Sequence, residues 1–332
     1  MPQTRRSGLG PAETCPEGRE EQRAAEGESV GIGTHGAGQG SKPPVALAIA
    51  SMGKTQISRK SRSALDFRFA CPIHDAHSMS RLLAAAGTLV DRIKINAISR
   101  ETRADRVLWI KERRPAATPI LACANRFFRL AGNPVRALDD LAEWQRWEVE
   151  CFEHLHGGRF RAFAEGDRCV AADEMPGVNL TVPLEAGTLK PAMCAAAARE
   201  LRRAHASPCW RFGGEWSHGD PHLGNFLYEA AADRARLIDF EVIHDRAWDP
   251  DARHADDLLV FLQDLIGRVP AERWLPNARA FLVAYDRPAI VARLRARLVV
   301  PRGIARMWWM VRTTYLPAAE LQRRLEALRH AL

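Results

Sequence analysis

The order of apolar and polar positions divides the chain into an unpatterned first segment and a patterned remainder. Residues 1–78 are rich in Gly, Ser, Glu and Arg, and their apolar residues follow neither a helical nor a strand period. Such a segment cannot bury enough apolar surface to offset its chain entropy, so we expect a disordered tail over 1–78. An ordered domain is expected from residue 79 onward.

Short apolar runs predict strands in the first half of the patterned region. Residues 88–96 and 106–112 flank a polar segment, which is typical of an antiparallel hairpin. Residues 170–180 predict a further strand, broken by a Pro-Gly pair that suits a connection between lobes. Two more short strands, 226–228 and 236–240, flank a polar turn.

Helical spacing of apolar residues dominates the remaining sequence. Residues 139–156 repeat apolar side chains every three or four positions, and residues 191–205 are rich in alanine. Beyond Asp256 the pattern is helical to the end, with breaks at prolines. A strand-rich first half and a helix-rich second half favour an α+β protein of two lobes, which we place at 79–174 and 175–332.

Composition narrows the picture only slightly. The net charge is +8, six of the 48 cationic side chains are lysines, and the seven cysteines form no C-x-x-C pair. The positive charge favours anionic partners such as nucleotides, nucleic acid or acidic lipids, without choosing among them. Scattered cysteines, no long apolar run and a glutamate-rich beginning predict a cytoplasmic protein with reduced thiols and no secretory signal.

The segment 218–225 (His-Gly-Asp-Pro-His-Leu-Gly-Asn) and the later Asp239 carry the clearest chemistry. They place Asp220, Asn225 and Asp239 at the ends of neighbouring predicted strands. Two carboxylates and an amide in such positions can bind a hard divalent cation through oxygen, and Mg²⁺ prefers a site with few protein ligands. Phosphoryl transfer needs such a metal, a carboxylate near the acceptor hydroxyl and a cation on the phosphates.

Two other interpretations of this segment stay open at this point. His-Gly-Asp alone is also typical of a turn in which the aspartate caps its own backbone. His218, Asp220 and His222 alternate, so a strand could direct all three to one side as ligands of Zn²⁺ in a metallohydrolase. The zinc interpretation leaves Asn225 and Asp239 without a role, and therefore the magnesium interpretation is favoured.

Segments 218–225 and 237–241 (Leu-Ile-Asp-Phe-Glu) together resemble the catalytic and metal loops of protein-kinase-like phosphotransferases. They are most similar to the aminoglycoside phosphotransferase and choline kinase branch and to the bacterial lipopolysaccharide core-sugar kinases. The resemblance implies a two-lobed fold, with a small β-rich N-lobe and a larger helical C-lobe. It also implies that the protein uses ATP and Mg²⁺ to phosphorylate a hydroxyl group.

The same resemblance implies a role for each polar residue of the two loops. Asp220 would orient or deprotonate the acceptor hydroxyl, and His222 would face the transferred phosphate. Asn225 and Asp239 would hold Mg²⁺. Asp257 matches the C-lobe helix aspartate that supports the catalytic loop.

The resemblance further implies a lysine on an N-lobe strand that contacts the nucleotide phosphates. Lys111 lies in an apolar strand of a chain that uses arginine almost everywhere else. Its partner would be Glu148 or Glu150 on the predicted helix 139–156. The two glutamates are about 200° apart on a helix, so only one can face the site, and we favour Glu148.

Residues 173–180 resemble the segment between the lobes whose backbone hydrogen-bonds adenine, with Asp173 and Met175 as the contact residues. The sequence also departs from the family pattern. No Gly-x-Gly-x-x-Gly precedes the lysine, and only Gly87 is available to cover the phosphates. Residues 125–132 form an insertion that the pattern does not place.

The acceptor is left open by the sequence. Segment 287–312 is basic, with a Met-Trp-Trp-Met run inside it. It predicts either a surface for an anionic acceptor, such as a glycolipid at an anionic membrane face, or a solvated helix face. We expect ATP and a hydroxyl-bearing small molecule or glycolipid as partners, and no nucleic acid. An atypical protein serine/threonine kinase and a nucleotide-binding pseudokinase are the other kinase-like classes that the residues allow.

Overall fold

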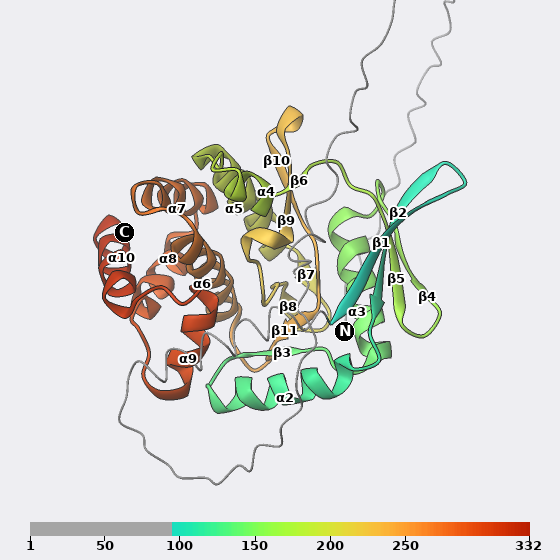
Figure 1. The fold of residues 1–332 in the computed structure, drawn as a ribbon, viewed down its shortest axis with the longest axis horizontal. Helices are drawn as coiled ribbons and strands as arrows, with labels where there is room; N and C mark the ends of the chain where they lie inside the picture. The colour runs from blue at the N-terminus through green and yellow to red at the C-terminus, as the bar shows by residue number, and fades with distance from the viewer. Residues whose placement is uncertain (1–94) are drawn as a thin grey trace, which may run out of the picture. The chain divides into compact units, whose positions relative to one another are not determined.

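The structure is a computed structural model that describes residues 95–332 (Figure 1). The predicted tail (1–78) and Gly87 therefore lie outside the described residues. Within the described part of the chain, no helix is long and apolar enough to cross a membrane.

A four-stranded antiparallel sheet forms most of the first part of the described chain, with strand order β1-β2-β5-β4. The strands are β1 (Asn96–Arg103), β2 (Arg106–Arg113), β4 (Ala162–Glu165) and β5 (Cys169–Asp173). Helix α3 (Leu141–His156) contacts β4 and β5, as Figure 1 shows. Its first turn is capped by Asp140, whose carboxylate accepts the Glu143 N–H at 2.8 Å, so the predicted helix is confirmed.

The predicted hairpin is present, but its first strand and its turn lie elsewhere than expected. Residues 96–103 form the strand where a polar turn was predicted, and residues 88–94 lie outside the described residues. The turn is the pair Ala104-Asp105, with φ of 44° and 66°, as a two-residue hairpin turn requires. The sequence pattern missed β1 because it is an edge strand with mostly exposed polar side chains, and apolar alternation does not mark such a strand.

The unplaced insertion 125–132 belongs largely to a helix, α2 (Ala117–Leu130), which leads into the short strand β3 (Val135–Ala137). The Asn125 amide fixes this connection, because it accepts the Ala137 N–H at 2.7 Å and donates to the Ala137 carbonyl at 2.9 Å. Strand β3 pairs with β11 (Val242–His244), antiparallel and in the register Val242 to Ala137. The insertion is thereby joined to the strand that follows Asp239.

The second part of the chain is helical around two small sheets. One sheet has the order β10-β9-β6, and the other pairs β7 with β8. These strands are β6 (Val178–Asn179), β7 (Pro208–Cys209), β8 (Gly214–Glu215), β9 (Phe226–Glu229) and β10 (Arg234–Leu237). The helices are α4 (Thr181–Glu185), α5 (Pro191–His205), α6 (Pro250–Arg268), α7 (Ala271–Tyr285), α8 (Pro288–Arg297), α9 (Gly303–Arg312) and α10 (Ala318–Ala331). Short 3₁₀ turns are η1 (Leu223–Asn225) and η2 (Ala230–Ala232).

The predicted α+β class is confirmed, because a strand-rich first part is followed by a helical second part. Helix α6 begins at Pro250, six residues before the predicted start. The carboxylate of Asp249 accepts the Ala252 N–H at 3.0 Å and so caps the helix there.

Stacked aromatic rings lie at the centre of the helical part. Phe261 of α6 and Phe281 of α7 are fully buried, with ring centroids 3.9 Å apart and planes within 8°. Phe226 of β9 meets Phe261 edge to face at 5.6 Å. These contacts join α6, α7 and β9, which immediately follows the segment 218–225.

Truncation of this stack should destabilise the protein. Phe281→Ala is expected to lower the free energy of unfolding by about 3–5 kcal/mol, since it removes a buried ring and leaves a cavity. The matched control is Val283→Ala on the same helix, whose side chain is 78% exposed and whose truncation should cost less than about 0.5 kcal/mol. Urea denaturation measures both, and equal effects would contradict this account of the core.

Candidate active site

Lys111, on β2, is the centre of a group of ion pairs. Its Nζ lies 2.8 Å from Glu148 Oε1, 2.7 Å from Asp239 Oδ1 and 3.2 Å from Glu241 Oε1. Burial lowers the pKa of Lys111, but the charges of Asp239, Glu148 and Glu241 outweigh it, so the pKa is raised well above its usual value. Lys111 is therefore a fixed positive charge on a strand, and its carboxylate partners come from a helix and a loop.

Of the two glutamates weighed from the sequence, Glu148 is the one that contacts Lys111. Its second oxygen, Oε2, accepts the Phe240 N–H at 3.0 Å, which ties α3 to the residue after Asp239. Burial raises the pKa of Glu148, partly offset by Lys111. Among the described residues, Glu150 does not contact Lys111, and its Oε2 is buried without a hydrogen-bond partner.

Glu241 and Arg113 complete the group and were not singled out from the sequence as site residues. Arg113 is fully buried, lies over the Trp144 ring at 4.2 Å, and its Nη2 is 3.4 Å from Glu241 Oε2. The Asn96 amide donates to the other Glu241 oxygen. Burial and the nearby Asp239 raise the pKa of Glu241 to about 7. The signal in the sequence was the glutamate directly after Asp239-Phe240, where a protein kinase has glycine.

Asp239 combines a functional charge with an unfavourable backbone conformation. Its φ is 72°, in the left-handed region that non-glycine residues rarely adopt and that clusters at functional sites. Burial alone would raise its pKa, but Lys111 lowers it to about 2, so the side chain is a carboxylate. The side chain is 39% exposed, so a ligand can reach it from solvent.

Asp257 of α6 holds the segment 218–225 through hydrogen bonds to its backbone. One Asp257 oxygen accepts the His218 N–H at 2.7 Å and lies 2.9 Å from His205 Nε2, and the other accepts the Gly219 N–H at 2.8 Å. Burial opposes the charge, but nearby histidines, His244 first, keep the pKa of Asp257 below its usual range. The predicted supporting aspartate thus contacts the loop directly. Gly219, at φ 90°, is needed here because a Cβ would lie 3.2 Å from the Val242 carbonyl oxygen.

A tight turn brings Asp220, His222 and Asn225 together. The Asp220 carbonyl accepts the His222 N–H at 2.9 Å and the Asn225 Nδ2–H at 2.8 Å. The Asn225 carbonyl accepts the Ile238 N–H at 3.0 Å, which fixes this turn beside the segment that carries Asp239. The side chain of His222 accepts the Gly224 N–H at 3.0 Å through Nδ1.

The side chain of Asp220 has a partner that the sequence did not predict. Arg312, the last residue of α9, donates from Nη1 to Asp220 Oδ1 at 2.5 Å. The basic segment 287–312 was identified from the sequence, but nothing in it distinguished Arg312 from its neighbouring arginines.

The geometry does not support a zinc site. His218 Nε2 lies 3.1 Å from the Ile238 carbonyl, and His218 Nδ1 accepts the Asp220 N–H at 3.2 Å, so both ring nitrogens are engaged. Among residues 95–332, no three His, Cys, Asp or Glu side chains are grouped to hold a metal ion. The predicted magnesium ligands are a different set, since one of them is the amide of Asn225.

The two predicted hinge residues, Asp173 and Met175, differ in whether their backbone N–H is available to a nucleotide. The Asp173 N–H donates to the Arg161 carbonyl at 2.8 Å, and its carboxylate pairs with Arg106 and accepts the Arg161 N–H. Met175 is buried, and its N–H has no hydrogen-bond acceptor within the described chain. Of the two, only Met175 has a free backbone donor.

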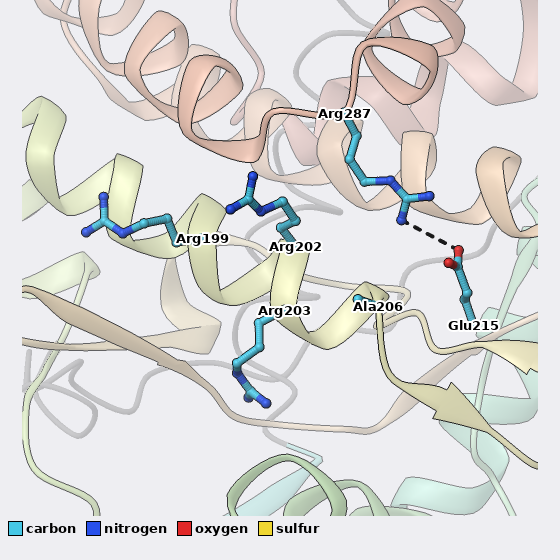
Figure 2. Close-up of a pocket in the computed structure, with 6 residues that line it drawn as sticks. All are labelled: Arg199, Arg202, Arg203, Ala206, Glu215 and Arg287. Carbon is cyan, nitrogen blue, oxygen red and sulfur yellow. Dashed lines mark ion pairs between the residues drawn. The ribbon is translucent and has the colours of Figure 1, made fainter.

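A surface hollow of about 450 Å³ beside α5 is lined by arginines but is not the predicted site (Figure 2). Arg199 pairs with Asp233, Arg202 with Asp286, Arg203 with Glu200 and Arg287 with Glu215. Each arginine is neutralised, and none of the residues predicted for the site lines the hollow.

The sequence matches no protein-family model and no curated protein. Among solved structures, the chain is similar to the Rv3197–erythromycin complex from Mycobacterium tuberculosis, at 17% identity over 58% of this chain and 51% of that one, with a TM-score of 0.34. It is similar to the bifunctional kinase-methyltransferase WbdD, at 17% identity, 70% and 46% coverage and a TM-score of 0.35. A third is an ethanolamine kinase of Plasmodium vivax, at 10% identity, 76% and 86% coverage and a TM-score of 0.39. The chain spans about half the length of the first two.

A lysine of β2 pairs with a glutamate of α3, and the loop that Asp257 supports precedes the β9–β10 hairpin, after which Asp239 follows. This order, in a strand-rich part followed by a helical part, is the one that the sequence resemblance leads us to expect.

The buried histidines around Asp257 make stability depend on pH. Burial and the ring of His205, stacked at 3.9 Å, lower the pKa of His254 to about 2. The folded state therefore keeps His254 neutral, while the unfolded state takes up a proton below its ordinary pKa of about 6.5. The stability contributed by the neutral ring is complete above that pH and is lost as the pH falls, by about 1.4 kcal/mol per pH unit at most.

We therefore expect His254→Gln to flatten the fall in unfolding free energy between pH 6 and pH 4. Glutamine retains a donor for the Trp216 carbonyl, which His254 Nε2 contacts at 2.9 Å. The control is His330→Gln, at an exposed position of α10, which should keep the wild-type slope. Denaturant unfolding at a series of pH values gives the slopes, and an unchanged slope in His254→Gln would refute the assignment.

Proposed function

We propose that the protein is an ATP- and Mg²⁺-dependent phosphotransferase that moves the γ-phosphate to a hydroxyl of a small molecule or a lipopolysaccharide-type sugar. The observation that carries the proposal is the position of Lys111 Nζ, 2.8 Å from Glu148 and 2.7 Å from Asp239. A lysine held between a helix carboxylate and a loop carboxylate can place its charge on nucleotide phosphates beside a metal ligand.

Each residue predicted for the site has a separate role in this proposal. Glu148 holds Lys111 from the helix, and Lys111 exchanges its contact with Asp239 for the nucleotide phosphates. The free N–H of Met175 donates to adenine, and Asp173 anchors the hinge strand. Asp220 accepts the proton of the acceptor hydroxyl, and His222 lies beside the transferred phosphate.

The metal would be held by Asp239 and Asn225. When bound, Mg²⁺ neutralises the charge of the phosphates during transfer. The donor set suits it, because Asp239 is a carboxylate whose side chain is 39% exposed and Asn225 supplies an amide oxygen, and Mg²⁺ prefers such oxygen ligands.

The segment after Asp239 favours a small acceptor over a protein. Glu241 is followed at once by β11, which pairs with β3, so no long activation loop separates the metal aspartate from the next strand. The presence of Lys111, Asp220, Asn225 and Asp239 supports a catalyst rather than a pseudokinase. A transfer screen with ATP against aminoglycosides, choline-like amines, core sugars and generic proteins tests this. No ATP binding and no transfer would overturn the proposal, and a phosphorylated protein would move it to the protein kinase class.

Asp239→Asn should weaken nucleotide binding only when magnesium is present. Asparagine tolerates the left-handed backbone and keeps the side-chain shape, so the change removes mainly the charge. We expect the gain in ATP affinity on adding Mg²⁺ to fall at least about tenfold, measured by calorimetry. The control is Asp105→Asn in the exposed β1–β2 turn, also at positive φ. An unchanged magnesium effect would count against Asp239 as the ligand.

Asp220→Asn should abolish transfer and leave nucleotide binding intact. Loss of the carboxylate removes the proton acceptor, so turnover is expected to fall by about 10²–10⁴. ATP affinity should stay within about twofold, because Asp220 pairs with Arg312 and not with Lys111. ADP release and calorimetry measure the two quantities, with Asp233→Asn in the exposed turn of η2 as the control. Retained turnover would contradict the role of Asp220.

A further inference from the structure

The ion pair between Arg312 and Asp220 has no role in the proposed transfer step. Arg312 Nη1 lies 2.5 Å from Asp220 Oδ1, and the arginine side chain is only 11% exposed. An arginine so close to the proposed proton acceptor occupies a carboxylate oxygen that the acceptor hydroxyl would need. The pair must serve some other purpose, or be broken before transfer.

Arg312 is held in place by contacts of its own. Its guanidinium lies over the Trp308 ring at 4.6 Å, and Trp308 meets Phe128 of α2 edge to face at 4.8 Å. The backbone after Arg312 packs directly on α6 at Gly267, where a Cβ would lie 2.5 Å from the Thr313 carbonyl carbon. The guanidinium is therefore positioned by neighbouring elements as well as by its attraction to Asp220.

The guanidinium also has unused donor capacity. Arg312 Nε is buried and has no hydrogen-bond partner among the described residues, and Asp220 is reached through Nη1 alone. Buried donors are normally satisfied, so an unpaired one beside a reactive carboxylate indicates a site for an acceptor atom of a ligand. A planar guanidinium best binds the paired oxygens of a carboxylate or phosphate.

The segment that carries Arg312 has an excess of positive charge. From Arg287 to Ala319 the sequence has seven arginines and no aspartate or glutamate, and three of the arginines besides Arg312 pair with carboxylates of other segments. The nearby Asp264 on α6 is already engaged, since it accepts the Leu223 N–H at 3.0 Å and lies 3.6 Å from Arg268. A polycationic or quaternary-amine acceptor would be repelled by Arg312, while the carboxylates of Asp220 and Asp264 are already paired with Arg312 and Arg268.

We propose that Arg312 is a specificity residue of the acceptor site and binds a carboxylate or phosphate group that the acceptor carries beside its reactive hydroxyl. The proposal rests on the proposed phosphotransferase function and names its substrate class. Binding of that anion draws Arg312 away from Asp220. Asp220 then takes the hydroxyl proton, the acceptor oxygen forms a bond to the γ-phosphorus, the bond to the β–γ bridging oxygen breaks, and ADP leaves.

The experiment uses the full chain with Mg²⁺ and a non-hydrolysable ATP analogue bound. The probes are glycerol, glycerate and glycerol 3-phosphate, with choline as the cationic compound. Vesicles of phosphatidylglycerol and of phosphatidylcholine present the corresponding groups on a lipid. We expect an anionic probe to bind at least about tenfold more tightly than glycerol or choline by calorimetry. Preference for the soluble probe or for phosphatidylglycerol vesicles tells whether the anion belongs to a free molecule or a lipid.

Three variants test the residue. Arg312→Gln should abolish the preference for the anion, and Arg312→Lys should retain part of it, because lysine keeps the charge but not the planar fork. Arg306→Gln, exposed on the same helix, should leave it unchanged. With any acceptor that turns over, Arg312→Gln should raise KM for the anionic member far more than for its neutral counterpart.

The binding measurements distinguish an error in the role of Arg312 from an error in the proposed function. If the Mg²⁺–nucleotide complex does not bind, the phosphotransferase function is wrong. If it binds but the wild-type protein shows no preference for an anion, only the role of Arg312 is overturned. An Arg312→Gln variant that keeps the preference, or loses affinity for every probe equally with a lower melting temperature, would also overturn it.

Discussion

Lys111 lies on β2, Glu148 on α3 and Asp239 on the segment between β10 and β11, so one buried ammonium joins residues up to 128 positions apart, with Glu241 close by. A buried charge is tolerated only when it is paired, and removing a single partner from such a group leaves an uncompensated charge. The positions of the sheet, the helix and the loop therefore depend on the same contact. The backbone bond from Phe240 to Glu148 fixes the loop at the same point.

The same group is unbalanced in charge, and this imbalance connects stability to function. Three carboxylates face Lys111 and Arg113, and burial together with Asp239 raises the pKa of Glu241 to about 7. A purely structural network would be expected to approach neutrality, because like charges at close range cost free energy. An excess of carboxylates on a partly open side chain such as Asp239 is instead an arrangement that a cation can complete.

Several elements were predictable because the signal is local. The helices show apolar repeats and caps, and the angle between two positions on α3 shows that only one of Glu148 and Glu150 can face Lys111. Asp257 was recognised from a motif. Other parts depend on contacts that no local pattern carries. Edge strand β1 is polar on both faces, and the insertion is fixed by Asn125 bonding to a strand twelve residues away.

Arg312 shows the limit most clearly. In the sequence it is one of seven arginines in a basic segment, and only the tertiary structure separates it from the rest. What separates it is the close approach of α9 to α6 at Gly267 and the contact of Trp308 with Phe128. Neither Gly267 nor Trp308 belongs to a recognisable motif. Their tertiary contacts could therefore not be predicted from the sequence.

Helix α9, which reaches Asp220 through Arg312, contacts helix α2 through Trp308 and Phe128. Helix α2 and helix α9 lie outside both the four-stranded sheet and the loop that Asp257 supports. The Lys111 group and the Asp257 network contain no residue of α2 or α9, although Asn125 of α2 fixes β3 beside β11 and Arg312 of α9 contacts Asp220. For the phosphotransferase that we propose, the acceptor would be changed by altering the contact between Trp308, Phe128 and Arg312. We therefore infer that the choice of acceptor is determined mainly at this contact, and the transfer step by the buried charges around Lys111.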